Sequence, residues 1–234
     1  MVDAAALTHL GLVRRNNEDC FYASAQQGLC VLADGMGGAL AGETASGVAV
    51  QTVAEIVASQ PATAQLLEAA FVEADRRVRA ASAANPAMRG MGTTLVAALD
   101  TGAGIAVANA GDSRCWLWEG GRLTLLTSDH SWVNEVGRGL GLSEQELGSH
   151  PLRHALTSAI GVGAERPVQT ALIHPPAGSL ILLSSDGLHG VVSDSAVAAV
   201  LASGLSLGDM CERLIQLALD AGGPDNVTAV LARL

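Results

Sequence analysis

The sequence predicts an α+β protein in which antiparallel sheets are covered by helices. Short β-rich segments occur in runs and do not alternate one by one with helices, which argues against a parallel doubly wound sheet. The chain has 234 residues, of which 49% are hydrophobic and only 15% are charged, so a well-buried core is expected. Since aromatic residues make up only 3%, we expect that core to consist of Val, Leu, Ile and Ala.

The N-terminal half of the chain predicts one buried strand followed by two helices. Residues 29–33 form a short apolar run that ends at Asp34 and Gly35, as expected of a strand stopped by a turn. Apolar residues then recur at helical spacing from about 42 to 59 and from about 62 to 84.

The remainder predicts further strands, two more helices and a closing strand. A hairpin signal, Gly120-Gly121, separates the β-rich segments 116–118 and 123–125. Other strands are expected at 93–99, 103–109, 113–118, 168–173, 179–184 and 227–231. Helices are expected at 194–203, and from a capping box at Ser206 to about 221.

We expect residues 1–234 to form one domain, because no linker, charge run or internal repeat divides the chain. Residues 131–167 are less regular, with scattered glycines and weak periodicity. They predict a partly helical insertion over the surface, and Trp132 within it is interpreted as a packing anchor rather than a peptide contact.

Composition excludes several classes of protein. A formal net charge of −10 argues against binding to nucleic acid or to an anionic membrane surface. No apolar stretch is long enough to span a bilayer, and the first residues lack the pattern of a secretory signal. The four cysteines are irregularly spaced, as expected of buried thiols in a reducing compartment. A cytoplasmic location is expected.

Aspartates lie at the ends of predicted strands. Asp34 and Asp186 each follow an apolar strand and precede glycine, Asp225 opens the last strand, and Asp19 ends a polar segment. Such carboxylates lose hydration and repel one another, and divalent cations offset both effects. Mg²⁺ and Mn²⁺ prefer oxygen ligands and can acidify a water molecule for attack on a phosphate ester. An isolated Asp-Gly is more often a turn, so the spacing alone leaves open a hydrolase and an ion-binding module.

Several ordered segments, spread over about residues 8–231, resemble the metal-dependent protein phosphatases of the PP2C (PPM) family. The main segments are 11–19 (GLVRRNNED), 33–38 (ADGMGG), 92–94 (GTT), 109–114 (NAGDSR), and 185–187 (SDG) with 223–228 (GPDNVT). Residues 127–131 and 150–153 match two further landmarks of the family. The short length and the form of segment 33–38 resemble the bacterial branch.

The resemblance implies a four-layer α-β-β-α sandwich, with two central antiparallel sheets flanked by pairs of helices. It also implies metal-dependent hydrolysis of phosphoserine and phosphothreonine in proteins, in which a water or hydroxide between two metals attacks phosphorus directly. The implied cofactor is Mn²⁺ or Mg²⁺, with two ions in the core site and a third in bacterial members. The implied partners are phosphorylated proteins and a cognate Ser/Thr kinase.

The resemblance also assigns roles to individual residues. It places the metal site at Asp19, Asp34, Gly35, Asp129, Asp186 and Asp225. Asp34 would bridge two metals, and Asp19 with its neighbour Glu18 would contact metal-bound waters. Arg14 would bind the substrate phosphate, since a guanidinium can donate two parallel hydrogen bonds to its oxygens. Asn226 would orient Asp225 from behind.

One position departs from the pattern of eukaryotic members. Met36 stands where those members carry a histidine proposed as general acid, and methionine cannot donate a proton. The identity of the acid therefore stays open. Two alternatives to the main hypothesis also stay open: a non-catalytic metal-binding regulatory module with the same fold, and a phosphatase of small phosphate esters.

Overall fold

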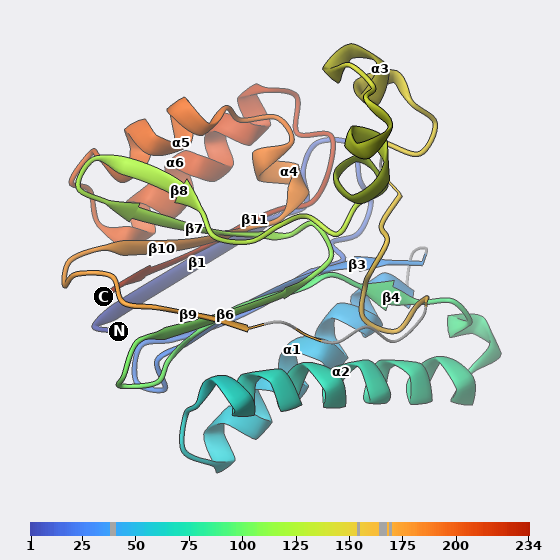
Figure 1. The fold of residues 1–234 in the computed structure, drawn as a ribbon, viewed down its shortest axis with the longest axis horizontal. Coiled ribbons are helices and arrows are strands. Elements are labelled where there is room, and N and C mark those ends of the chain that lie inside the picture. Colours follow the sequence, from blue (N-terminus) through green and yellow to red (C-terminus); the bar gives the residue numbers. More distant parts are fainter. Residues whose placement is uncertain (38–40, 154, 164–167, 169) are drawn as a thin grey trace.

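Two antiparallel β-sheets lie face to face in the computed structural model, with helices on the outer side of each (Figure 1). The structure describes residues 1–37, 41–153, 155–163, 168 and 170–234. Gly38 of the segment 33–38, and residues 154 and 164–167 of the predicted insertion, lie outside the described residues.

The first sheet brings the two ends of the described chain together. Its five strands, in spatial order, are β1 (Asp3–His9), β11 (Val227–Arg233), β10 (Leu180–Ser184), β7 (Arg114–Glu119) and β8 (Arg122–Leu125). Strand β1 pairs with β11 from Asp3 opposite Arg233 to His9 opposite Val227, so the termini are neighbours. The predicted hairpin is confirmed, with Trp116 opposite Leu125.

The second sheet is built around the apolar strand that the sequence predicts. Its strands are β2 (Asp19–Ser24), β3 (Leu29–Met36), β5 (Leu95–Asp100), β6 (Ile105–Ala110) and β9 (Thr170–Ile173), with the short β4 (Gly92–Thr93) pairing β3. Strand β3 is buried on both faces: Val31 packs against the helices, whereas Cys30 and Leu32 pack against the other sheet. This explains its continuous apolar sequence.

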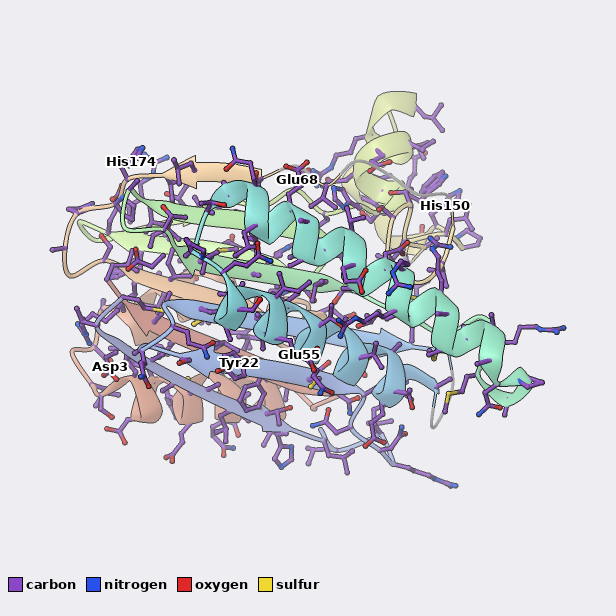
Figure 2. The ribbon with its side chains drawn as sticks, turned by 90° about the horizontal axis from the view of Figure 1, so that it is seen from below. Asp3, Tyr22, Glu55, Glu68, His150 and His174 are labelled. Atoms are coloured by element: carbon purple, nitrogen blue, oxygen red, sulfur yellow. The ribbon has the colours of Figure 1, made fainter. Side chains whose placement is uncertain are left out.

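Helices cover the outer face of each sheet. Helices α1 (Ala41–Ser59) and α2 (Ala64–Ala84) lie along the second sheet, and Figure 2 shows them crossing it together. Helices α5 (Asp194–Leu201), α6 (Leu207–Asp220) and the short α4 (Asp186–His189) cover the first sheet. Side-chain hydroxyls cap the N-termini of α2, α5 and α6, at Thr63, Ser193 and Ser206.

Three apolar layers fill the spaces between these four layers. The layer between the sheets includes Leu32, Val96, Ile181 and Val230, and the two outer layers join each sheet to its helices. Large aromatic side chains are few in the core, where Phe71 and Trp116 are buried among aliphatic neighbours. The predicted four-layer architecture and aliphatic core are therefore confirmed.

Residues 131–153 form part of the predicted insertion and are partly helical, as expected. They comprise the turns η2 (Val133–Gly137) and η3 (Arg138–Leu140) and the short helix α3 (Glu144–Ser149). The Trp132 ring stacks on His150 with 4.0 Å between ring centroids. A Cβ atom at Gly137 would approach the Trp132 ring to 2.9 Å. Trp132 is thus engaged by its own segment, which supports its interpretation as a packing anchor.

Strands β1 and β2, the short helix α4 and a 3₁₀ turn after α2 are absent from the sequence-based prediction. Strand β1 was not predicted, because its alanine-rich sequence has low β propensity and no clear alternation. Asp186 opens helix α4, where the sequence predicted only a turn after the strand. A short 3₁₀ turn, η1 (Pro86–Met88), follows α2. No helix within the described residues has the length and apolar content needed to cross a bilayer.

Candidate functional site

The strand ends that carry the predicted site residues meet at one edge of the sandwich. Asp19 begins β2 and stands directly opposite Asp34 in the β2–β3 ladder. Asp186 begins α4 just after β10, and Asp225 lies two residues before β11. Opposed carboxylates on adjacent strands repel each other, so this register is unfavourable unless something neutralises it.

Asp19 is buried, with only 9% of its surface exposed. Its Oδ2 accepts hydrogen bonds from Ser185 Oγ at 2.9 Å and Thr228 Oγ1 at 2.6 Å. Burial nevertheless raises the pKa of Asp19 to about 7, since the loss of hydration outweighs the two hydroxyl donors. Its Oδ1 is buried and has no hydrogen-bond partner among the described residues. A buried carboxylate oxygen without a partner is what a bound cation or its water would satisfy.

Asp34 lies at the centre of this group of carboxylates. Burial raises its pKa well above the usual range, and the nearby charges of Asp19 and Asp186 raise it further. Its backbone is fixed by Thr94, which accepts from Asp34 N at 2.9 Å through Oγ1 and donates its own N–H to Asp34 O at 2.8 Å. Thr94 Oγ1 in turn lies 2.7 Å from Ser113 Oγ. Segment 92–94 thus holds the strand end that carries Asp34, a role that the sequence did not indicate.

Glycine is required at position 35 because the backbone is crowded there. A Cβ atom at Gly35 would lie 2.2 Å from the carbonyl oxygen of Gly42, in the first turn of α1. Gly35 N donates to Glu18 O at 3.1 Å, and a Cβ at Gly42 would lie 2.0 Å from the Glu18 carboxylate. The backbone and carboxylate of Glu18 therefore lie against Gly35 and the first turn of α1, close to Asp34 in the chain.

Asn226 fastens the loop that joins β1 to β2. Its Nδ2 donates to Leu10 O at 2.9 Å and to Asn16 O at 3.0 Å, and its Oδ1 accepts from Glu18 N at 2.8 Å. The predicted role of Asn226 was to orient Asp225 alone. In the structure the Asn226 side chain also fixes residues 10–18, and these contacts were not predicted.

Asn226→Ala is expected to destabilise the protein by about 2–3 kcal/mol. The substitution removes three hydrogen bonds and leaves buried backbone groups without partners. For a chain of this length, that loss lowers Tm by roughly 4–12 °C. Differential scanning calorimetry measures this change. Asn85→Ala, which removes an exposed cap at the start of η1, is the matched control and should cost no more than about 1 kcal/mol.

Arg14 and Asp225 form an ion pair, with Arg14 Nη2 at 2.6 Å from Asp225 Oδ2. The hydrogen bond to Asp225 is the main reason that the Arg14 pKa is raised. The Arg14 side chain is 55% exposed, so it lies at the rim of the site. In the structure, Arg14, which is predicted to bind the phosphate, therefore contacts Asp225, which is a predicted metal ligand. Asp225 Oδ1 accepts from Asn226 N at 2.8 Å, which leaves lone pairs on both oxygens for a cation.

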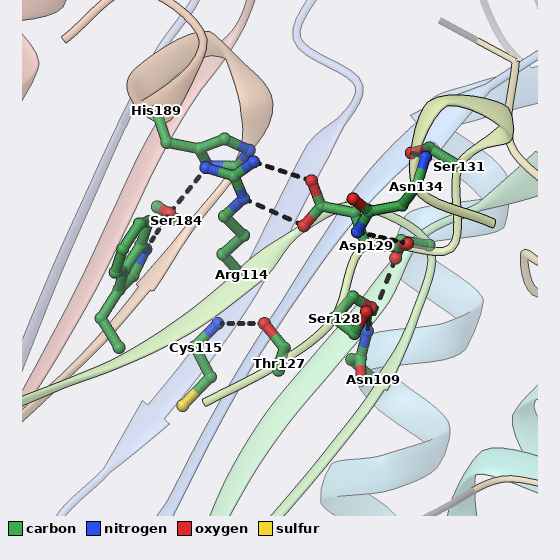
Figure 3. A network of polar contacts seen from close by, with 12 residues as sticks. Asn109, Arg114, Cys115, Thr127, Ser128, Asp129, Ser131, Asn134, Ser184 and His189 are labelled. Atoms are coloured by element: carbon green, nitrogen blue, oxygen red, sulfur yellow. Dashed lines mark hydrogen bonds and ion pairs between the residues drawn. The ribbon is translucent and has the colours of Figure 1, made fainter. Parts of the chain in front are cut away.

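Asp129 is held by Arg114, a partner that the sequence did not indicate. Arg114 donates through Nε to Asp129 Oδ1 at 3.0 Å and through Nη2 to Oδ2 at 2.7 Å, as Figure 3 shows. The guanidinium also lies over the Trp116 ring, 5.6 Å from its centroid. Asn134 of the insertion donates to the Asp129 carbonyl at 3.2 Å. Binding of a third cation at Asp129 would therefore compete with a bidentate ion pair.

Asp112, in the segment 109–114, also lies near the aspartates of the site. Burial, with a further contribution from the charges of Asp186 and Asp129, raises the pKa of Asp112 to about 7. Asp112 thus connects the central carboxylates to the Arg114–Asp129 pair. Met36, the last residue of β3, pairs with Gly92 of β4 and offers no proton donor.

The donor set suits a hard divalent cation. Asp19, Asp34, Asp186 and Asp225 all supply oxygen ligands, and the buried Asp19 Oδ1 lacks a partner among the described residues. Within the described part of the chain, no three His, Cys, Asp or Glu side chains already converge as a complete cation cage. Mg²⁺-type sites use one or two carboxylates and several waters, so an incomplete protein cage fits that chemistry.

Comparisons with known proteins agree with this geometry. The family model described as protein phosphatase 2C matches residues 13–216. The serine/threonine protein phosphatase PstP of Mycobacterium tuberculosis (strain CDC 1551 / Oshkosh) is 39% identical over 230 residues, which cover 97% of this chain. The chain spans only 44% of the length of that relative.

Two further matches cover nearly the whole of both chains. The serine/threonine phosphatase stp of Listeria welshimeri is 34% identical over 233 residues, covering 96% of this chain and 92% of its own length. A crystal structure of the PstP catalytic domain in complex with two manganese ions superposes with a TM-score of 0.88 at 36% identity. That match covers 99% of this chain and 97% of the other.

Proposed function

This chain belongs to the protein phosphatase 2C family, and we propose that it hydrolyses phosphoserine and phosphothreonine in proteins with Mn²⁺ or Mg²⁺ as cofactor. The observation that carries this proposal is the position of Asp19, Asp34, Asp186 and Asp225 at one edge of the sandwich, where the charges of the other aspartates raise the pKa values of Asp19 and Asp34. Their mutual repulsion and burial are unfavourable in the absence of a cation, and a divalent cation removes both problems.

We propose that Asp34, the Gly35 carbonyl, Asp186 and Asp225 would hold two divalent cations. Asp19 and Glu18 would contact water molecules bound to them. When bound, such cations supply an acidified water and neutralise charge on the phosphoryl oxygens. The two manganese ions of the PstP catalytic domain support a two-ion site. A third ion at Asp129, shared with Asp186, would compete with the Arg114 guanidinium for the Asp129 carboxylate.

Residues of the chain bind the substrate phosphate and fix the Asp19 carboxylate. Arg14 lies at the exposed rim and can exchange its contact with Asp225 for the phosphate of a substrate. Ser185 and Thr228 donate hydrogen bonds to Asp19 Oδ2 and fix the carboxylate, so that Asp19 Oδ1 is held in one place. Because Met36 cannot donate a proton, a water in the site is the proposed proton source for the departing serine or threonine oxygen.

The proposed partners are phosphorylated proteins and a cognate Ser/Thr kinase, and the proposed location is the cytoplasm. The named activities of the PstP and stp relatives support protein substrates. The alternative of a regulatory module without catalysis is disfavoured, because all four central aspartates and Arg14 are present at one edge. A phosphatase of small esters would use the same residues, so substrate comparison decides between the two.

The test is release of inorganic phosphate from a phosphothreonine peptide, compared with release from nucleotides. Wild type with Mn²⁺ should release phosphate from the peptide, whereas EDTA or Asp186→Ala should abolish release while the far-UV circular dichroism spectrum is retained. Faster hydrolysis of nucleotides would favour the small-ester alternative. Failure of wild type on every phosphate ester, despite bound Mn²⁺, would contradict catalysis itself.

Arg14→Ala is expected to raise KM for a phosphopeptide about tenfold, with a smaller fall in kcat. The guanidinium supplies charge-assisted hydrogen bonds to the phosphate, each worth about 1.5–3 kcal/mol. Steady-state kinetics with Mn²⁺ measure the effect. Arg122→Ala is the control, because Arg122 is exposed on β8 and has no ion-pair partner among the described residues. If Arg14→Ala changes neither constant, Arg14 does not bind the phosphate.

A further inference from the structure

Two large apolar side chains are exposed beside Arg14. Leu12 is 64% exposed and Val13 is 68% exposed. Single exposed aliphatic residues are common on protein surfaces and need no explanation. Among the described residues, however, these two are the only consecutive large hydrophobic residues with such exposure. They immediately precede the residue proposed to bind the substrate phosphate.

The loop that carries these side chains is fixed in place. Leu12 N donates to Gly223 O at 2.8 Å, and Asn226 holds the loop on both sides through Leu10 O and Asn16 O. Gly11 adopts φ +79°, and a Cβ atom there would lie 2.2 Å from Asp225 O. Because the backbone is already ordered, a ligand that covers Leu12 and Val13 loses little conformational entropy of the loop on binding.

The charges beside this apolar pair suit an anionic segment. The chain carries a net charge of −10, yet Arg14 and Arg15 follow Val13 directly and both are exposed. Arg15 has no ion-pair partner among the described residues, and Arg14 is paired with Asp225 of the site. A phosphorylated segment therefore meets positive charge and apolar surface at the same place, within a molecule that otherwise repels anions.

From these observations we infer that Leu12 and Val13 form an apolar platform for the residues flanking the phosphorylated side chain of a protein substrate. This inference rests on the proposed function and names its substrate class: segments with a bulky aliphatic residue close to the phosphoserine or phosphothreonine. Leu12 and Val13 lie within two residues of Arg14, a reach of about 7 Å along the backbone. An extended peptide advances about 3.3 Å per residue, so the matching aliphatic residue lies one or two positions from the phosphorylated one.

The experiment compares two phosphothreonine peptides in three proteins. One peptide has leucine at the first and second positions on both sides of phosphothreonine, and the other has asparagine, which is similar in shape, at the same positions. The proteins are wild type, Leu12→Asn/Val13→Thr, and the control Leu205→Asn, whose exposed leucine lies in the α5–α6 loop. Each kcat/KM is divided by that for p-nitrophenyl phosphate in the same protein, which removes general effects on the site.

Wild type and Leu205→Asn should prefer the leucine peptide by about tenfold, the size of effect expected from covering two aliphatic side chains. In Leu12→Asn/Val13→Thr the preference should fall to about one. An absent preference in wild type, or an unchanged one in the double variant, would overturn the platform.

A binding measurement separates this inference from the proposed function. Fluorescence anisotropy with non-hydrolysable phosphonate versions of the two peptides gives the ratio of their Kd values without any turnover. If no phosphate ester is hydrolysed, the proposed function fails, and the Kd ratio still decides on the platform. Tenfold tighter binding of the leucine peptide that is lost in the double variant supports it. Equal Kd values for the two peptides in wild type contradict it.

Discussion

Asp34→Asn is expected to abolish phosphatase activity and to stabilise the metal-free protein. Wild type must either protonate the buried Asp34 carboxyl or hold its charge beside Asp19 and Asp186. Both cost free energy relative to the unfolded chain, in which the carboxyl is hydrated and ionised. Asparagine has nearly the same shape as aspartate and carries no charge, so neither protonation nor burial of a charge is needed. We therefore expect a gain of about 1–2 kcal/mol in metal-free stability, or roughly 2–8 °C in Tm.

The effect on activity has the opposite sign because the same carboxylate is proposed to hold the catalytic cations. Loss of that ligand should reduce kcat/KM at least about 1000-fold, equivalent to roughly 4 kcal/mol of transition-state stabilisation. Replacing a residue that destabilises the fold but is needed for activity typically raises stability and lowers activity. A purely structural aspartate would lose stability and activity together.

Two measurements on the same preparations check this prediction. Differential scanning fluorimetry in EDTA and in Mn²⁺ reports Tm, and phosphate release from a phosphothreonine peptide reports activity. Asp220→Asn removes one exposed carboxylate near the end of α6 and should leave both quantities within error of wild type. A lower Tm for Asp34→Asn in EDTA, or retention of near-normal turnover, would show that Asp34 is not a destabilised metal ligand.

Local sequence patterns predicted most of the fold, because the information needed lies within each element. Apolar periodicity located α1 and α2, and the Gly120-Gly121 turn located the β7–β8 hairpin. Strand β1 escaped prediction because its pairing with β11, more than 200 residues away, makes it a strand in spite of its alanines. Tertiary context here overrides local propensity.

The candidate site also combines local features, which the sequence predicted, with contacts between distant residues, which it did not. The positions of Asp34 and Asp186 at strand ends are local features, and the family resemblance added roles for them. The contacts that tune these carboxylates are not local: Thr228 reaches Asp19 across 209 positions. Arg114 reaches Asp129 across 15 positions, and no pattern in the sequence indicated that they pair. Such partners depend on strand register and side-chain direction, which a single sequence does not specify.

The metal-free protein is expected to lose stability between pH 6.5 and pH 8. Burial raises the pKa values of Asp19 and Asp112 to about 7, against about 3.9 in an unfolded chain. In this pH range the folded protein therefore binds more protons than the unfolded protein, and stability falls as pH rises. The two groups together contribute about 1–2 kcal/mol over the interval, a fall in Tm of roughly 3–6 °C.

The lower limit of this range is set by His189. Burial holds the pKa of His189 well below its usual value, so its effect on stability has the opposite sign. Its folded form binds fewer protons than the unfolded chain, and its contribution to stability rises with pH until the unfolded pKa near 6.5 is passed. Above that pH, Asp19 and Asp112 determine the trend together with Asp34, whose pKa burial raises well above its usual range and which acts in the same direction.

Mn²⁺ is expected to reverse this pH dependence. The cation binds the ionised carboxylates, so protons compete with it, and its stabilisation should be larger at pH 8 than at pH 6.5. Differential scanning fluorimetry at several pH values, in EDTA and in Mn²⁺, measures both trends, and Asp19→Asn should flatten the EDTA curve. If Tm in EDTA does not fall over this range, or if Mn²⁺ raises Tm equally at both limits, the carboxylates are not the proton-linked cation ligands proposed for this site.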